Sequence, residues 1–113
     1  MTKGKIILVP FPFDDFSETK VRPAICLTDE IGFYNHIIIA FISSQILHSL
    51  EDSDLLIEMK NKDFKSTGLS VNSVVKLHRL VTISKSLIKR QLGVLPPNHQ
   101  KEIEYKLKTM FEL

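Results

Sequence analysis

The chain has few of the residues on which several classes of protein depend. It contains one cysteine, no tryptophan and four glycines among 113 residues. A single cysteine can form no intrachain disulfide and no cysteine-based metal site. Because Cys26 lies within an apolar run, we expect a buried, unreactive thiol in a reducing compartment.

The chain also lacks a strong net charge. Lys and Arg total 15 against 13 Asp and Glu, which gives a formal charge of +2 at neutral pH. A strongly basic chain would indicate a nucleic-acid partner, so a basic surface here has to come from local clustering. One such cluster is predicted to form either a phosphate-binding rim or an ordinary solvated face: Lys76, Arg79, Lys85, Lys89 and Arg90.

Long apolar runs are missing as well. The first run, residues 6–9, soon meets two prolines and the acidic pair 14–15, so we expect neither an export signal nor a membrane segment. Hydrophobic residues make up 43% of the chain and charged residues 25%. This composition predicts one soluble domain over residues 1–113, and we expect it in the cytoplasm.

No glycine-rich phosphate loop, zinc-ligand spacing or nucleophile elbow occurs in the sequence, so we expect no metal and no cofactor. The histidines, His36, His48, His78 and His99, follow no ligand spacing, and we expect each at a surface or edge position. His78 differs from the others because it shares a predicted strand face with Lys76.

What the chain does contain is a series of short apolar runs separated by turns. Strands are predicted over residues 5–11, 22–28, 36–42, 54–59, 73–80 and 89–95. The fifth strand either continues over 81–83 or turns there, with a brief 3₁₀ turn at 84–87. Residues 61–68 read as a short turn that Gly68 ends as a C-cap.

A C-terminal helix is predicted from Pro97, because proline suits the first helical position. Ile103, Leu107, Met110 and Phe111 form an apolar stripe that we expect to cover the sheet. The fold class is therefore mainly β with a C-terminal helix: a small, strongly curved, mostly antiparallel sheet or barrel with the helix packed on it.

Arg22 stands between an acidic loop and an apolar strand. Pro23 favours an extended conformation at Arg22, and the strand behind it supplies a rigid backbone. This placement suits a guanidinium that binds a phosphate through two parallel hydrogen bonds. The alternative is a structural salt bridge to Asp14, Asp15 or Glu18.

Three small polar residues, Ser43, Ser44 and Gln45, follow the six apolar residues 37–42. They mark a strand that leaves the core. Their side chains predict either the capping of a turn or contact with a ligand.

Several motifs occur in a fixed order along nearly the whole chain. They are Gly4-Lys5-Ile6, VPFPF at 9–13, VRPA at 21–24, ISSQ at 42–45, Gly68-Leu69, SVVKL at 73–77, Thr82-Ile83, Leu92-Gly93 and the final helix. In this order they resemble the MazF/PemK family of toxin endoribonucleases, which belong to type II toxin–antitoxin systems.

The resemblance implies an SH3-like barrel of the CcdB/PemK toxin type. It also implies a homodimer that cuts single-stranded RNA at a short sequence without a metal. The RNA 2′-hydroxyl would be the nucleophile, leaving a 2′,3′-cyclic phosphate and a 5′-hydroxyl. A cognate antitoxin protein would inhibit the toxin by occupying the RNA groove.

The resemblance further assigns roles to residues. Arg22 matches the family's catalytic arginine and would neutralise charge on the phosphorane. Ser43 matches the Thr or Ser at the end of the third strand, and its hydroxyl would hold a phosphate oxygen or relay a proton. RNA contacts are expected from Phe16, Ser17, Thr19, Lys20, Ser44, Gln45, Lys76 and His78.

The chain departs from the family pattern at two positions. Lys5 replaces a usual acidic residue, and Pro96 stands where a Ser or Thr commonly caps the last helix, which weakens that cap. Glu18 and His78 are both candidates for a second acid or base in the reaction. The competing interpretation is a non-catalytic SH3-like barrel that binds nucleic acid or protein, or a CcdB-like gyrase poison.

Overall fold

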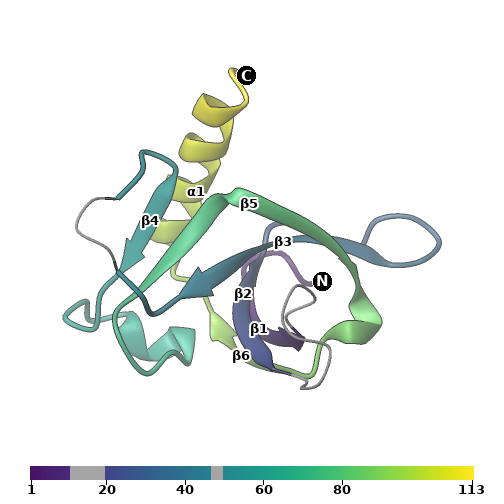
Figure 1. Cartoon of the computed structure of the whole chain (residues 1–113), viewed down its shortest axis with the longest axis horizontal. Coiled ribbons are helices and arrows are strands. Elements are labelled where there is room, and N and C mark those ends of the chain that lie inside the picture. Colours follow the sequence, from purple (N-terminus) through teal and green to yellow (C-terminus); the bar gives the residue numbers. More distant parts are fainter. Residues whose placement is uncertain (11–19, 47–49) are drawn as a thin grey trace.

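The computed structural model describes residues 1–10, 20–46 and 50–113 (Figure 1). Six strands form one antiparallel sheet: β1 (Lys5–Pro10), β2 (Val21–Cys26), β3 (His36–Ser43), β4 (Asp54–Ile57), β5 (Ser73–Ser84) and β6 (Arg90–Val94). Two 3₁₀ helices, η1 (Phe64–Thr67) and η2 (Lys85–Leu87), and the helix α1 (Pro97–Met110) complete the fold. The strand order β4-β5-β3-β2-β1-β6 describes a curled sheet, so the predicted fold class is confirmed.

β5 is the longest strand, with 12 residues. The sequence left its course after residue 80 open, and the structure continues it to Ser84. The second half pairs with the start of β3, where Val81 lies opposite Ile39 and Ile83 opposite Ile37. The register between the two strands shifts between Ala40 and Ile42, and a bulge of this kind bends a strand. One strand can therefore serve both halves of the curled sheet.

The two faces of the sheet bury two separate hydrophobic clusters. Ile6 and Ile25 belong to the cluster beside α1, whereas the neighbouring Ile7 and Ala24 belong to the cluster on the other face. Strands buried on both faces need apolar residues at successive positions, which explains the continuous runs in the sequence. Cys26 belongs to the second cluster and is buried, as predicted.

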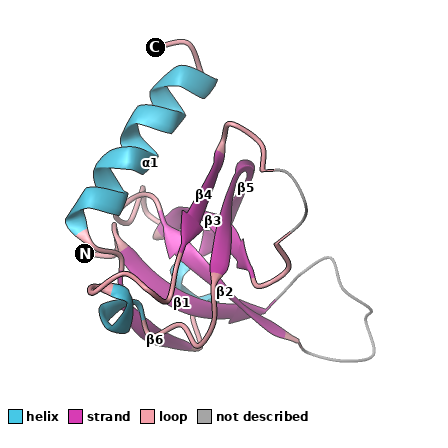
Figure 2. Cartoon of the chain, turned by 90° about the vertical axis from the view of Figure 1, so that its left-hand side faces the viewer, coloured by secondary structure: helices cyan, strands magenta, loops and turns pink. Residues whose placement is uncertain are grey.

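Helix α1 lies along the β4–β5 side of the sheet (Figure 2). Pro97 occupies its first turn, as predicted, and Pro96 provides no side-chain cap. Ile103 is buried and Leu107 packs partly buried against the first cluster. The prediction was wrong for Phe111, because the helix ends at Met110 and leaves Phe111 56% exposed.

The histidines do not all lie at the surface. His36 and His78 are exposed as expected, and His48 lies outside the described residues. The expectation was wrong for His99, which is 9% exposed. The first turn of α1 places it in a small cavity beside Phe64 and Thr67 of η1.

Two glycines allow η1 and β6 to approach closely. Gly68 ends η1 in the left-handed conformation, with a φ of 73°, which confirms the predicted C-cap. A Cβ added at Gly68 would lie 2.1 Å from the Leu92 carbonyl oxygen, and one at Gly93 would lie 2.2 Å from that of Ser66. Both contacts are with backbone, so neither glycine has room for a side chain.

Candidate functional site

Arg22 and Ser43 lie at the ends of neighbouring strands. β2 and β3 pair antiparallel, with Ala24 opposite Phe41. Extending this register by two residues sets Arg22 opposite Ser43. Residues that oppose each other in an antiparallel ladder project from the same face, with Cβ atoms about 5 Å apart. The two predicted catalytic residues therefore share one face and one row of the sheet.

The backbone of Arg22 is held by strand pairing on its other side. Val9 of β1, which is fully buried, lies opposite Arg22, while the Arg22 residue itself is exposed. Pro23 follows in the strand, opposite Leu8. This pairing supplies the predicted rigid backbone behind Arg22. The predicted alternative partners, Asp14, Asp15 and Glu18, lie outside the described residues.

Ser43 is half-buried where β3 leaves the sheet. Its Oγ accepts a hydrogen bond of 3.1 Å from the backbone N–H of Gln45, so the predicted turn capping is present. A hydroxyl that accepts a hydrogen bond still has its own hydrogen to donate. Capping the turn therefore also fixes the Ser43 hydroxyl, which is left able to donate to an anion.

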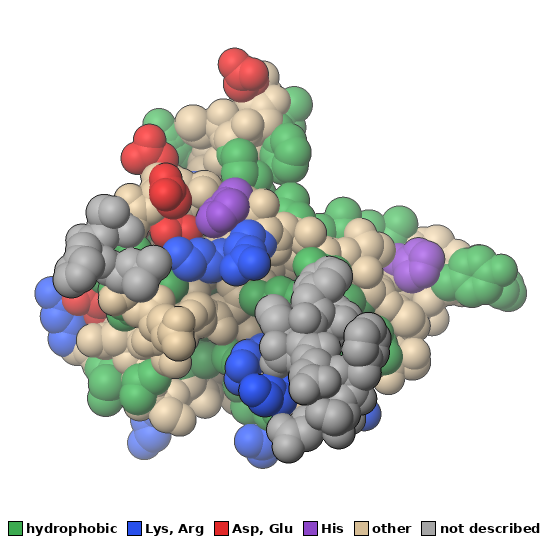
Figure 3. All heavy atoms as spheres, viewed as in Figure 1, with side chains coloured by type: hydrophobic (Ala, Val, Ile, Leu, Met, Phe, Trp, Pro, Cys, Tyr) green, Lys and Arg blue, Asp and Glu red, His purple; other side chains and the backbone are tan. Residues whose placement is uncertain are grey.

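Lys76 and His78 lie on the same face of the sheet as Ser43. Val74 of β5 lies opposite Ser43, and Lys76 and His78 follow it at alternate positions. Val75 and Leu77, which lie between them, point into the first hydrophobic cluster. In Figure 3, basic side chains adjoin a histidine near the middle of the face shown.

Asp54 joins this group, although it was not among the predicted site residues. Asp54 pairs with Lys76 across β4 and β5, and its side chain is 0% exposed. Its Oδ2 lies 3.1 Å from Lys76 Nζ, and its Oδ1 lies 3.9 Å from His78 Nδ1. An acidic residue at the start of an apolar strand was the available signal, but its partners depend on a register that the sequence does not reveal.

The remaining predicted RNA contacts divide into two groups. Lys20, Ser44 and Gln45 are exposed and adjoin the ends of β2 and β3. The predicted contacts Phe16, Ser17 and Thr19 lie outside the described residues. The structure thus gathers part of the predicted set around the end of β3.

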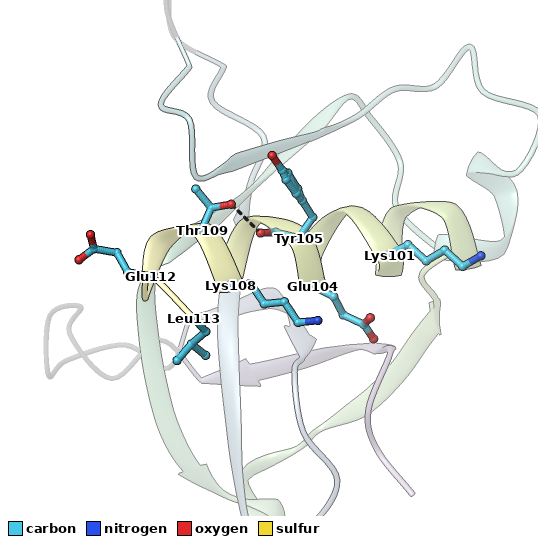
Figure 4. A pocket seen from close by; sticks show the side chains of 7 residues that line it. All are labelled: Lys101, Glu104, Tyr105, Lys108, Thr109, Glu112 and Leu113. Carbon is cyan, nitrogen blue, oxygen red and sulfur yellow. Dashed lines mark hydrogen bonds between the residues drawn. The ribbon is translucent and has the colours of Figure 1, made fainter.

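One hollow of about 530 Å³ lies elsewhere, on the outer side of α1 (Figure 4). Its lining consists of helix and C-terminal residues, among them Lys101, Tyr105 and Leu113, and includes no predicted site residue. Among the described residues, no group of three or more potential metal ligands is present. No helix in the same part of the chain is long and apolar enough to cross a membrane.

Fold and site together define a small β protein with a curled sheet, one C-terminal helix, and an arginine and a serine at adjacent strand ends. Guanidinium and hydroxyl groups of this kind bind phosphate well. A family model described as PemK-like, MazF-like toxin of type II toxin–antitoxin system matches residues 2–111. The chain belongs to this family.

Solved structures share the fold at low sequence identity. A Mycobacterium tuberculosis toxin, MazF-mt6, is 20% identical with a TM-score of 0.72, covering 96% of this chain and 97% of that one. MazF from Deinococcus radiodurans is 17% identical with a TM-score of 0.71, covering 100% and 97%.

A third similar structure is titled as an endoribonuclease in complex with its cognate antitoxin from Mycobacterial species. It is 11% identical, with a TM-score of 0.74 and coverage of 100% of this chain and 96% of that one. No curated protein matches the chain.

Proposed function

We propose that this chain is the toxin of a type II toxin–antitoxin system and cuts single-stranded RNA. Toxins of its family are generally endoribonucleases. The observation that supports the proposal is the antiparallel pairing of β2 and β3, whose register, extended by two residues from Ala24 and Phe41, brings Arg22 opposite Ser43. A passive binding module or a gyrase poison does not need this pair.

The proposed reaction is an intramolecular transesterification of the RNA. The 2′-oxygen attacks the adjacent phosphorus, the new O2′–P bond forms, and the bond from phosphorus to the 5′-oxygen breaks. The 2′-hydroxyl loses one proton and the 5′-oxygen gains one, so the step consumes no net proton. The products are a 2′,3′-cyclic phosphate and a 5′-hydroxyl.

Arg22 and Ser43 would act on the reacting phosphate. The guanidinium is a planar cation that offers paired donors, so it would neutralise the charge that builds on the phosphorane. The Ser43 hydroxyl would donate to a phosphate oxygen or pass a proton to the leaving oxygen. Because the nucleophile is part of the substrate, no metal-bound water is required as the attacking group.

Two partners complete the proposal. A second copy of the chain would form a homodimer, and a cognate antitoxin would cover the RNA-binding face. The solved endoribonuclease with its antitoxin, which shares the fold, supports the second of these.

The test compares the wild-type protein with Arg22→Ala on a long single-stranded RNA. Loss of this charge-assisted contact should lower the cleavage rate by at least about 10²-fold, because it acts where charge develops. Lys101→Ala, which removes an exposed cation from α1 away from every predicted site residue, is the matched control and should cut normally. Full cleavage by folded Arg22→Ala would overturn the mechanism, and a wild-type protein that cuts nothing but inhibits DNA supercoiling would favour the gyrase-poison alternative.

A further inference from the structure

Asp54 is a buried carboxylate at the first position of β4. Its side chain is 0% exposed, and its Oδ2 accepts hydrogen bonds from the Glu51 backbone N–H at 2.9 Å and from Lys76 Nζ at 3.1 Å. A buried charge is retained at a cost unless it is paired, and Lys76 supplies that pairing. The Lys76 side chain is itself only 19% exposed, so Asp54 fixes the position of the ammonium group.

The second carboxylate oxygen of Asp54 has no hydrogen-bond partner within the described residues. Oδ1 is buried and accepts no hydrogen bond within the described residues, which is costly for such an atom. His78 Nδ1 lies 3.9 Å away, and Ser53 Oγ lies 3.4 Å from the same nitrogen. A small rotation of the imidazole would let Nδ1–H donate to Oδ1. The His78 side chain is 47% exposed, so its outer nitrogen remains accessible.

The charge of this cluster depends on His78. With a neutral imidazole, Asp54 and Lys76 cancel each other. A proton on His78 gives the cluster a net charge of about +1, with an ammonium and an imidazolium that can only donate hydrogen bonds. A phosphate, which offers only acceptor oxygens, fits two such donors.

Other charged residues stand close to His78 and Asp54 in the chain. Arg79 follows His78 on β5 and is exposed. Asp52 precedes β4, and Lys106 of α1 donates to the Asp52 carbonyl oxygen at 2.9 Å and lies 3.8 Å from Glu102.

The place of the cluster on the sheet decides which phosphate it can reach. Lys76 and His78 lie two and four residues beyond Val74, which opposes Ser43. At roughly 3.3 Å per residue, they lie about 7 and 13 Å along β5 from Val74, at the point where the register between β3 and β5 shifts. This distance is too long for sharing the reacting phosphate, but it suits another phosphate of the same strand.

We propose that Asp54 positions Lys76 and His78 as a subsite for an RNA phosphate that flanks the cut. This subsite rests on the proposed function, because it assumes that RNA occupies the face of Arg22 and Ser43. Asp54 is a positioning residue in this account. The proposal thereby assigns the predicted RNA contacts Lys76 and His78 to a phosphate of the RNA.

The test measures the affinity for an RNA that carries a 2′-deoxy nucleotide at the mapped cut, so that it binds without reacting. Between about pH 8 and about pH 5.5, wild-type binding should tighten about tenfold, because an imidazolium donates to a phosphate more strongly than a neutral imidazole does. His78→Gln, which cannot gain a proton, should keep the weak binding of high pH throughout. At low pH its salt dependence should also fall by about 0.7 in logarithmic slope.

Two further variants separate positioning from general effects. Asp54→Asn keeps an acceptor for the Glu51 N–H but loses the counter-charge that holds Lys76, so RNA binding should weaken across the whole pH range. His36→Gln is the matched control: His36 is also exposed but lies at the far end of β3, and its variant should behave as wild type.

The outcomes are distinguishable. A protein that cuts and binds RNA while His78→Gln keeps the wild-type pH dependence would overturn the subsite and leave the proposed function intact. An effect of His78→Gln on antitoxin binding alone, with RNA binding unchanged, would also overturn it. A wild-type protein that neither cuts nor binds RNA would overturn the proposed function and the subsite together.

Discussion

At the scale of single residues, the proposed mechanism depends on the donor geometry of Arg22 as well as on its charge. The guanidinium presents two parallel donors on a rigid fork, whereas a lysine presents a compact ammonium. Arg22→Lys should therefore reduce the cleavage rate by about 10-fold or more while leaving the fold intact. Single-turnover cleavage with saturating protein measures this, and a lysine variant with the wild-type rate would show that charge alone suffices.

Ser43 has a structural and a proposed chemical role, and two substitutions separate them. Ser43→Thr keeps the hydroxyl for the Gln45 N–H and for the phosphate, so both cleavage and thermal stability should be retained. Ser43→Ala loses both and should cut about 10-fold or more slowly, with a stability loss of about 1 kcal/mol. Equal cleavage by the alanine variant would limit Ser43 to capping the turn.

Cys26 provides a test of burial. Loss of hydration in the core raises the pKa of its thiol from 9.0 to about 11. The thiolate fraction at about pH 8 should then be about 100-fold lower in the folded protein than in the unfolded chain, and alkylation slower by at least that factor. Mass spectrometry after timed iodoacetamide treatment, with and without denaturant, measures the ratio; similar rates would contradict a buried thiol.

The same shift has a defined sign for stability. The folded state favours the protonated thiol. The thiol's contribution to the free energy of unfolding is therefore fully present below about pH 9 and is lost as the pH rises towards about 11. Denaturant unfolding should show this loss in the wild-type protein and a smaller one in Cys26→Ala.

At the scale of elements, the contact between η1 and β6 is the most sharply defined. A Cβ at Gly93 would overlap the backbone of Ser66 and Thr67, so Gly93→Ala should cost about 3 kcal/mol of unfolding free energy. Gly32→Ala is the control, because that glycine has a φ of 73° but open space around it and should cost only about 1 kcal/mol. Equal losses in urea unfolding would contradict the close approach.

The sequence predicted the elements well because apolar runs, prolines and glycines mark them locally. The runs 6–9 and 37–42 became β1 and β3, and Pro97 and Gly68 marked a helix start and a turn end. The register was beyond prediction. The pairing of Asp54 with Lys76, which are 22 residues apart, and the bulge in β3 and β5 arise from packing between strands.

The candidate site was predictable to a different extent. The resemblance singled out Arg22 and Ser43, and the register of β2 and β3, extended by two residues, brings them into one row. Asp54 could not be found in the same way, because its role comes from two side chains on another strand. Phe111 shows the opposite error. The apolar stripe predicted that Phe111 belongs to the helix, but α1 ends one residue earlier, at Met110.

At the scale of the whole molecule, we expect a homodimer. The described surface leaves apolar side chains exposed on the turn between β2 and β3, including Phe33 and Tyr34. Another group, including Tyr105 and Leu113, lies at the C-terminal end of the chain. Exposed apolar groups of this kind are typical of interaction surfaces. Light scattering should give a mass about twice 12.9 kDa, and a stable monomer at micromolar concentration would contradict the dimer.

The measurement that tests the central claim most directly is cleavage of a long single-stranded RNA in the presence of EDTA, with chemical analysis of the new ends. The account predicts cuts at a short sequence that carry 2′,3′-cyclic phosphate and 5′-hydroxyl ends and that disappear in Arg22→Ala. Cleavage that requires a divalent ion, 5′-phosphate ends, or undiminished cutting by Arg22→Ala would each contradict it.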